Sequence, residues 1–312
     1  MAHRVDIKET EANRRLDRFL FAYLREAPHP LLYKLLRKKR IKLNGARAEG
    51  AEMLQAGDYL DLYLAPSTLD ELRGTYAPPP VAAPLTDIIY ENAEILVVNK
   101  PAGLVAHGGD DSLLARVLWY LYEAGAYDPS AAYTPALCNR LDTNTSGLTL
   151  CGKTLHALQK YTALFANDGV EKSYLAIAQG ELHGEATLEG VYKKDERTNK
   201  AKITPIIGGE SEKRAVTHYK SLAVAGGFTL LRVRPITGRS HQIRAHLASI
   251  GFPLAGDKKY GGKSTPYAPA QLLHAYKLSI KNHAQCWTAP PPQGMIRFIQ
   301  ELGILITEEE FI

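Results

Sequence analysis

The sequence is poor in the features that mark secreted, metal-binding and membrane proteins. Only three of its 312 residues are cysteines, and the spacing of Cys138, Cys151 and Cys286 argues against a disulfide framework or a cysteine-rich zinc site. No stretch approaches the roughly 20 apolar residues of a membrane span. The charged amino terminus also lacks the apolar segment of a signal peptide. We therefore expect a cytoplasmic protein with no membrane partner and no metal site.

Neither sign of charge is in large excess. The chain has 38 Lys and Arg residues against 33 Asp and Glu residues, which gives a formal net charge of +5. A wholly basic polycation is therefore excluded, and any surface that binds nucleic acid must be a local patch. No repeat of solenoid length is present either, so the length and the 45% hydrophobic content favour about two globular domains.

Proline is concentrated in one segment, between Ala65 and Thr86, where five prolines disfavour a regular helix or a central strand. We interpret this segment as a linker between two domains. The expected organisation is a small N-terminal domain over residues 12–65, a linker over 66–84 and a larger domain over 85–312.

The small domain is expected to contain two helices and then strands. Apolar residues recur every three or four positions over 16–24, as on one face of a helix, and Pro30–Lys39 fits a second helix. Ile41–Leu43 is predicted as a short strand before the turn pair Asn44-Gly45. The segment Gly57–Leu64 alternates in hydropathy as a half-buried strand does.

In the larger domain the predicted strands outnumber the helices and come partly in hairpin order. This pattern predicts an α+β fold with a mixed, largely antiparallel sheet. The expected strands are Ile88–Tyr90, Ile95–Val98, Leu148–Cys151, Tyr174–Ala178, Ala215–Leu222 and Phe228–Val233. The expected helices are Ser112–Glu123, Leu155–Phe165 and Gln242–Ile250.

The stretch from Leu31 to Ala48 is rich in basic residues and contains no acidic residue. Such a density of one charge must be screened by solvent or by a polyanion, and phosphate is the obvious polyanion. A solvated lysine-rich helix is the alternative. The order of two helices, a short strand, a turn and an alternating strand resembles the alpha-L RNA-binding domain. The candidate RNA-binding residues here are Lys34, Arg37, Lys38, Lys39, Arg40 and Lys42.

A polar loop between Cys138 and Thr154 contains Asp142 and leads into an apolar strand. Loops that present polar side chains at the edge of a sheet commonly carry chemistry. In the alternative interpretation Asp142 and Ser146 satisfy turn and cap hydrogen bonds, with Arg140 on the surface. The residues alone leave both interpretations open.

A second polar cluster runs from Pro235 to Leu247. If a helix begins near Ser240, Arg244 and His241 lie on the side away from its apolar stripe. An arginine projected from a helix that packs on a core is well placed to bind a carboxylate through two nitrogens. A capped surface helix is the alternative. The interpretation of His241 and His246 as metal ligands has less support than either of these, because the two histidines do not share a helical face.

Four ordered motifs between Leu85 and Leu278 are similar to those of one enzyme family. NRLDTNTSGLTL, from Asn139, is similar to a motif that reads His-Arg-Leu-Asp, then Thr-Ser-Gly and apolar residues. TGRSHQIRAHL, from Thr237, is similar to a later motif of the same family. Lys172–Ala176 matches its Lys-x-Tyr-Leu-Ala element, and Asn99–His107 matches its opening element. The chain thus resembles the RluA-type pseudouridine synthases over most of its length.

The resemblance implies an RNA-modifying isomerase that needs no redox step, no metal and no small-molecule cofactor. It makes Asp142 the nucleophile or proton acceptor, pairs Arg244 with the anionic form of Asp142, and places Tyr174 against the base. A uridine inside a stacked helix must be flipped out, and the resemblance places Arg140 near the gap it leaves. The candidate contacts to the RNA backbone are Arg239, Lys172 and Lys100.

One position departs from the family pattern, because Asn139 stands where the family commonly has histidine. A neutral amide keeps hydrogen bonds but cannot carry charge, so its effect on local positioning is open. The retained Asp142 favours activity. Two alternatives remain: a glycoside hydrolase, for which Asp257 would be the second carboxylate although a turn role suits it better, and an RNA-binding or ribosome-assembly factor without activity.

The expected partner is RNA. The domain order resembles that of family members acting on large-subunit ribosomal RNA, which favours this RNA over transfer RNA by analogy of fold alone. We expect the protein to be a monomer.

Overall fold

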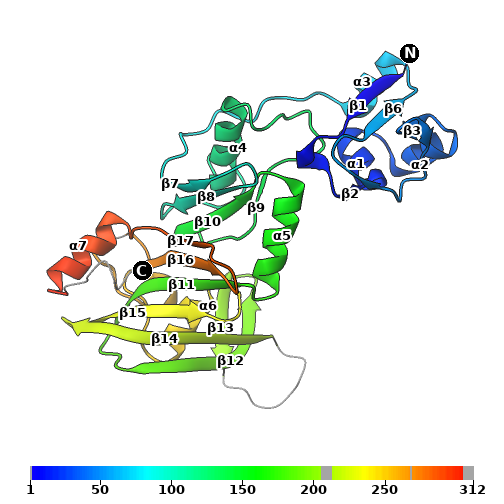
Figure 1. The fold of residues 1–312 in the computed structure, drawn as a ribbon. Coiled ribbons are helices and arrows are strands. Elements are labelled where there is room, and N and C mark those ends of the chain that lie inside the picture. Colours follow the sequence, from blue (N-terminus) through cyan, green and yellow to red (C-terminus); the bar gives the residue numbers. More distant parts are fainter. Residues whose placement is uncertain (1, 205–212, 268, 305–312) are drawn as a thin grey trace.

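The computed structural model describes residues 2–204, 213–267 and 269–304, which form a small N-terminal unit and a larger unit built on one sheet (Figure 1). None of the helices in these ranges combines the length and the apolar character that a membrane span requires. The predicted larger domain ends at residue 312, and its last positions, 305–312, lie outside the described residues.

The N-terminal unit contains a four-stranded antiparallel sheet in the order β1-β6-β3-β4 and a separate pair of short strands. The predicted Asn44-Gly45 turn joins β3 to β4, and both of its residues have positive φ, which suits a tight hairpin. The strands are β1 (His3–Asp6), β2 (Arg14–Arg15), β3 (Ile41–Leu43), β4 (Ala46–Arg47), β5 (Met53–Leu54) and β6 (Tyr59–Leu62).

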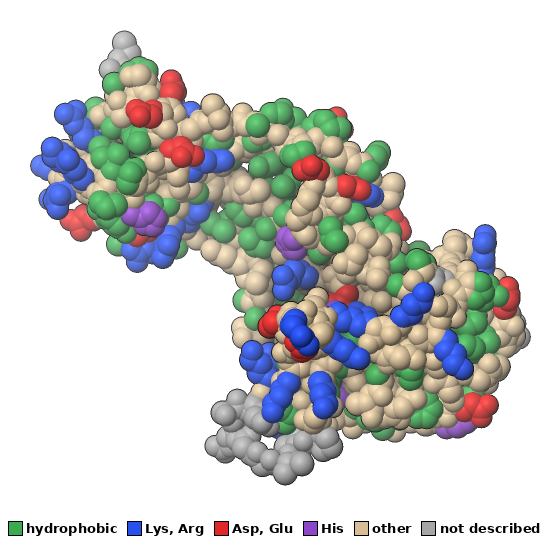
Figure 2. Space-filling model, turned by 180° about the vertical axis from the view of Figure 1, so that it is seen from behind, with side chains coloured by type: hydrophobic (Ala, Val, Ile, Leu, Met, Phe, Trp, Pro, Cys, Tyr) green, Lys and Arg blue, Asp and Glu red, His purple; other side chains and the backbone are tan. Residues whose placement is uncertain are grey.

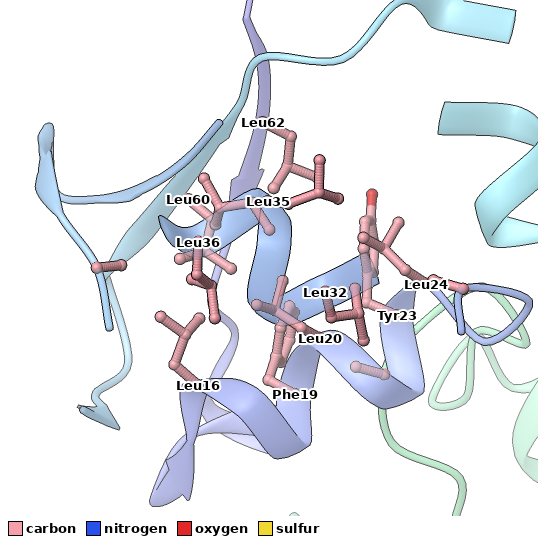
Figure 3. Packing of buried hydrophobic residues seen from close by; sticks show 14 of the residues in the cluster. Leu16, Phe19, Leu20, Tyr23, Leu24, Leu32, Leu35, Leu36, Leu60 and Leu62 are labelled. Carbon is pink, nitrogen blue, oxygen red and sulfur yellow. The ribbon is translucent and has the colours of Figure 1, made fainter. Parts of the chain in front are cut away.

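Two helices, α1 (Leu16–Tyr23) and α2 (His29–Arg37), pack against this sheet as predicted. Figure 3 shows Phe19 and Leu20 of α1 pointing toward Leu32 of α2, and all three are almost completely buried. Each such side chain contributes roughly 1.5–3 kcal/mol of stability by leaving water. Because the apolar residues of α2 face this core, its basic residues are left on the outer surface.

The prediction that the proline-rich segment contains no helix is wrong for its first part, where α3 spans Pro66–Arg73. Pro66 occupies the first turn of the helix, where proline is tolerated because that N–H has no helical partner. Leu69 and Leu72 are buried in the N-terminal core, which gives this segment a reason to fold. Residues 74–87 contain neither helix nor strand and lead to the larger unit.

The N-terminal unit contacts a loop of the larger unit at Ala132. Glu11, in the short 3-10 helix η1 (Glu9–Glu11), accepts a hydrogen bond from the N–H of Ala132 at 2.7 Å. Arg14 donates to the carbonyl of the same residue at 2.7 Å. Ala132 itself packs in the N-terminal core, and Glu11 is only 4% exposed. The two units are therefore joined by shielded polar contacts as well as by the chain.

The larger unit is built on a sheet whose main path runs β13-β12-β14-β15-β11-β16-β10-β8-β7. Among the described pairings only β10 with β16 is parallel, which confirms the predicted α+β class and largely antiparallel sheet. Its strands are β7 (Ile88–Glu91), β8 (Ile95–Lys100), β9 (Ala136–Leu137), β10 (Ser146–Gly152), β11 (Val170–Gln179), β12 (Glu185–Asp195), β13 (Lys200–Thr204), β14 (Arg214–Ala225), β15 (Phe228–Pro235), β16 (Leu273–Ile280) and β17 (Cys286–Thr288).

The helices of this unit cover both faces of the sheet. In β11, Leu175 and Ile177 pack in one core cluster with α7, whereas Ala176 and Ala178 pack in another with α6. Since successive side chains of a strand point to opposite faces, α6 and α7 lie on opposite sides of the sheet. The helices are α4 (Leu113–Glu123), α5 (Leu155–Ala166), α6 (Gln242–Ser249), the 3-10 helix η2 (Lys258–Tyr260) and α7 (Gln293–Glu301).

The predicted strands and helices of this unit are all present, with their ends shifted by a few residues. Local chemistry explains the helix starts, because the hydroxyls of Ser112 and Thr154 cap α4 and α5. Sequence analysis missed the β12–β13 hairpin, β16 and α7. The last of these buries Met295 and Phe298 in the core.

Candidate active site

The predicted catalytic residues meet in a cleft of about 600 Å³ on the α6 face of the sheet. Asp142 comes from the loop before β10, Tyr174 from β11 and Arg244 from α6. Arg140 and Arg239 line the same cleft, and both are exposed. In the view of Figure 2, Lys and Arg side chains gather near the middle of the larger unit and again on the N-terminal unit.

Arg244 lies between two carboxylates. Asp257 accepts two hydrogen bonds from it, at 2.7 Å from Nε and 2.8 Å from Nη2, and Oδ2 of Asp142 lies 3.2 Å from Nη1. The side chain of Asp257 is 1% exposed and that of Asp142 is 26% exposed. Burial lowers the pKa of Arg244, but the hydrogen bonds and charges of Asp257 and, to a smaller extent, Asp142 together outweigh burial and raise it. Arg244 is thus a fixed cation that orients Asp142 in the cleft.

The prediction that Lys100 contacts the RNA backbone is wrong. The residue lies inside the protein, with 0% of its surface exposed. Its ammonium donates hydrogen bonds to three carbonyl oxygens, of Pro101 and Leu104 at 2.8 Å and of Thr143 at 2.9 Å. Burial lowers the pKa of Lys100 to about 8, and the charge of Asp142 opposes this shift. Lys100 therefore ties the loop next to Asp142 to the end of β8.

Asn139 anchors the other side of the same loop. Its amide nitrogen donates to the carbonyl of Leu148 at 3.2 Å, and its amide oxygen accepts from the N–H of Leu150 at 2.8 Å. Both partners belong to β10, between the part paired with β16 and the part paired with β9. The side-chain amide of Asn139 therefore pairs with β10 as the backbone of a neighbouring strand would. Through this pairing it holds the loop that continues to Arg140 and Asp142.

Tyr174 forms part of the cleft wall. Burial raises the pKa of its phenol above the ordinary value, and the negative charge of Asp142 acts in the same direction. The hydroxyl therefore keeps its proton at neutral pH. In that state it can donate a hydrogen bond, while the ring offers a flat apolar surface to a base.

The six basic candidates of the N-terminal unit are not in the cleft. Lys34, Arg37, Lys38, Lys39 and Arg40 are exposed on α2 and just after it, and Lys42 on β3 is half-buried. They form a surface separate from the cleft. Whether this unit is an alpha-L domain remains a prediction.

Sequence reasoning missed the function of Asp257, to which it assigned a turn. The turn is present, since the Asp257 carbonyl accepts from Tyr260 and Gly262, but its carboxylate is also the main partner of Arg244. A signal was available: a buried arginine requires a carboxylate partner. Asp257 is the acidic residue of the segment AGDKKYGG that follows α6.

Residues 94–249 match the family model described as RNA pseudouridylate synthase. The chain is 32% identical over 314 residues to ribosomal large subunit pseudouridine synthase C of Escherichia coli (strain K12), with 96% of each chain covered. It is 30% identical over 313 residues to an uncharacterized RNA pseudouridine synthase of Bacillus subtilis (strain 168), with 96% of this chain and 98% of that protein covered.

A solved structure, that of human RNA pseudouridylate synthase domain containing 4, shares the fold with a TM-score of 0.58 at 23% identity, over 71% of this chain and 95% of that one. The full-length similarity to the two bacterial proteins extends beyond the matched family model into both units. These findings agree with the four motifs and with the cleft that they line. The chain therefore belongs to the RluA family of RNA pseudouridine synthases, isomerases whose substrate is RNA.

Proposed function

We propose that this chain converts specific uridines of large-subunit ribosomal RNA to pseudouridine, with Asp142 as the nucleophile or proton acceptor. The observation that carries the proposal is the ion pair between Asp142 and Arg244, at 3.2 Å, in a cleft that also contains Tyr174. The RNA target is supported by the relatives named ribosomal large subunit pseudouridine synthase C, such as that of Vibrio vulnificus at 33% identity.

The reaction breaks the bond from the ribose to a ring nitrogen, turns the base and joins the ribose to a ring carbon. This carbon loses a proton and the freed ring nitrogen gains one, so that substrate and product are isomers. Asp142 would act on the sugar or the base, since an ionised carboxylate can be a nucleophile or a base. The hydrogen bond from Arg244 would hold the carboxylate of Asp142 in place. The ring of Tyr174 would hold the detached uracil within the cleft.

Access to a stacked uridine requires base flipping, which costs a few kcal/mol. Arg140 is exposed at the cleft and precedes Asp142 by two residues, so its planar guanidinium can occupy the gap in the stack while Asp142 meets the flipped nucleotide. Arg239, which also lines the cleft and is exposed, would contact the backbone phosphates.

The exposed basic surface of α2 would bind a second part of the RNA, as the predicted alpha-L domain does. Its contacts would be to phosphates, because lysine and arginine side chains on a convex helix carry charge without base-specific geometry. Such contacts supply affinity and orientation, while the cleft selects the uridine.

The competing functions receive less support from the geometry. A glycoside hydrolase needs a second free carboxylate, and Asp257 is buried and bound to Arg244 through both oxygens. A transfer-RNA substrate uses the same chemistry and is separated only by experiment. An inactive RNA-binding factor has no need of an arginine placed against Asp142.

The test compares pseudouridine maps of ribosomal and transfer RNA from cells with the gene, without it, and with Asp142→Asn in its place. We expect sites in large-subunit ribosomal RNA to be lost on deletion and restored by the unchanged protein but not by Asp142→Asn. The purified variant should still bind RNA. If only sites in transfer RNA are lost, the substrate is transfer RNA and not ribosomal RNA. Full rescue by Asp142→Asn would refute the role of this aspartate.

A further inference from the structure

A second side chain besides Arg244 faces Asp142, and it is held in an unusual conformation. His241 immediately precedes α6, and its φ of +55° lies in the left-handed region, which is unfavourable for a residue with a side chain. Its imidazole is 9% exposed, and Nε2 lies 3.7 Å from Oδ2 of Asp142. Unfavourable backbone geometry at a cleft is a reason to ask what the side chain does there.

The other ring nitrogen of His241 reports which tautomer is present. Nδ1 lies 3.0 Å from the hydroxyl of Tyr260, and that hydroxyl oxygen already accepts a hydrogen bond from the N–H of Ala201 at 2.8 Å. Burial raises the pKa of Tyr260 to about 12, so its hydroxyl keeps its proton. Donation of that proton to Nδ1 satisfies both atoms, which leaves the imidazole proton on Nε2, facing Asp142.

Burial of the ring favours the neutral imidazole, and the two nearby cations act in the same direction. Burial lowers the pKa of His241, and Asp142 opposes this shift; Arg244 and Lys259 then lower it again, and Asp257 raises it. Because Arg244 already provides the cation at this site, a neutral donor adds direction without adding a second positive charge. A neutral Nε2–H is therefore the form that meets Asp142.

Both neighbours approach the same oxygen of Asp142. Nη1 of Arg244 lies 3.2 Å and Nε2 of His241 lies 3.7 Å from Oδ2. Arg244 donates a hydrogen bond to Oδ2, whereas Nε2 of His241 lies just beyond hydrogen-bond distance. A small approach on substrate binding, as is common for such contacts, would give Oδ2 two donors and fix the rotation of the carboxylate group. The second oxygen, Oδ1, is then the one presented to the cleft.

We propose that His241 is a positioning residue for Asp142: the Nε2–H, directed by Tyr260, holds Oδ2 together with Arg244, so that Oδ1 meets the nucleotide. The proposal rests on the proposed function, in which Asp142 reacts with the substrate. It assigns Tyr260 the task of selecting the tautomer. The N–H of Ala201, from β13, holds the Tyr260 hydroxyl in turn.

Nitrogen-15 NMR of the histidine rings tests the tautomer without RNA and without turnover. The His241 signals are identified by their loss in His241→Asn. We expect a protonated Nε2 and an unprotonated Nδ1 in the unchanged protein at neutral pH, and a shift of population toward the other tautomer in Tyr260→Phe. A proton on Nδ1 in the unchanged protein would overturn the proposal, whatever the activity of the Asp142→Asn variant.

Two substitutions then separate positioning from backbone strain. The side-chain amide nitrogen of His241→Gln can reach the place of Nε2, whereas that of His241→Asn cannot, although asparagine tolerates the left-handed backbone better. Positioning predicts that His241→Asn lowers kcat by about tenfold or more, with KM for RNA unchanged, and that His241→Gln recovers most of the loss. Strain predicts the reverse order.

Each outcome decides the question. If His241→Asn is as active as His241→Gln, His241 does not position Asp142. If the substitutions change KM alone, His241 is a contact to the RNA and not a positioning residue. If neither variant folds, the His241 signals are assigned instead by their shift in Tyr260→Phe, and the tautomer in the unchanged protein decides. If Asp142→Asn keeps full activity, the proposed function fails, while a protonated Nε2 would still describe the resting site.

Discussion

Removal of the Asp257 carboxylate should separate the structural and the catalytic roles of Arg244. In Asp257→Ala the guanidinium loses two hydrogen bonds, at 2.7 and 2.8 Å, inside a site where its side chain is 8% exposed. Removal of one partner from a buried ion pair typically costs 3–5 kcal/mol. Asp142 remains 3.2 Å away as a second anion, so we expect about 3 kcal/mol, the lower end of this range.

The assay is denaturant unfolding of the unchanged protein and of Asp257→Ala, together with single-turnover pseudouridine formation. We expect kcat to fall by about 100-fold, because an arginine free to turn no longer holds Asp142 in one orientation. RNA affinity should change little, since Asp257 does not line the cleft.

A double variant provides the control. Replacement of both partners of a buried pair by apolar residues of similar size is often neutral for stability. Arg244→Met with Asp257→Leu should therefore recover most of the lost stability and none of the activity. A cost below about 1 kcal/mol for Asp257→Ala, or a double variant no more stable than the single one, would refute this account of the pair.

Three further predictions concern other parts of the molecule. Asn139→Asp removes the hydrogen-bond donor to β10, so we expect the free energy of unfolding, measured with denaturant, to fall by about 1–3 kcal/mol and kcat to fall as well. An unchanged kcat would contradict the view that Asn139 anchors the Asp142 loop. Burial lowers the pKa of His274 to about 4, so on acidification the unfolded chain binds this proton before the folded protein does. The free energy of unfolding should therefore fall by about 3 kcal/mol as the pH falls from 6.5 to 4. His274→Gln should flatten this pH dependence, and an equally steep curve for the variant would contradict the role of His274. Neutralising Lys38, Lys39 and Arg40 together should weaken RNA binding and lower the slope of log affinity against log salt by up to about 3, and an unchanged salt titration would exclude this surface as an RNA contact.

Local pattern was sufficient to predict most of the elements that carry the site. The apolar period of Gln242–Ile250 placed Arg244 on a helix, and the polar loop before an apolar strand placed Asp142 at the edge of a sheet. Both inferences depend on neighbours in sequence. The meeting of Asp142 and Arg244 came from the family resemblance, because 102 residues separate them and no local rule joins them.

The errors have a common physical cause, which is burial by distant parts of the chain. Lys100 was predicted as a contact to the RNA backbone. It is buried instead, and three carbonyls from its own turn and from the Asp142 loop offset the cost of burying its charge. Pro66 was interpreted as a helix breaker, and the N-terminal core that buries Leu69 and Leu72 makes it a helix start instead. Asp257 was assigned to a turn that it does form.

The contact around Ala132 has a consequence for how the enzyme meets a large RNA. Residues 74–87 tether the two units. Because this segment is rich in proline it is semi-rigid, and at about 3.1 Å per residue its ends stay within roughly 43 Å of each other, which still corresponds to a local concentration in the millimolar range. Three hydrogen bonds, one of them from Arg25 to the carbonyl of Pro129, and a small apolar contact are too weak to join separate proteins. Within one chain they can therefore keep the units docked. In the proposed function, the basic surface of α2 and the cleft would bind RNA as two linked sites whose spacing is set in advance. Proteolysis within 74–87 would then reduce the affinity without changing either surface.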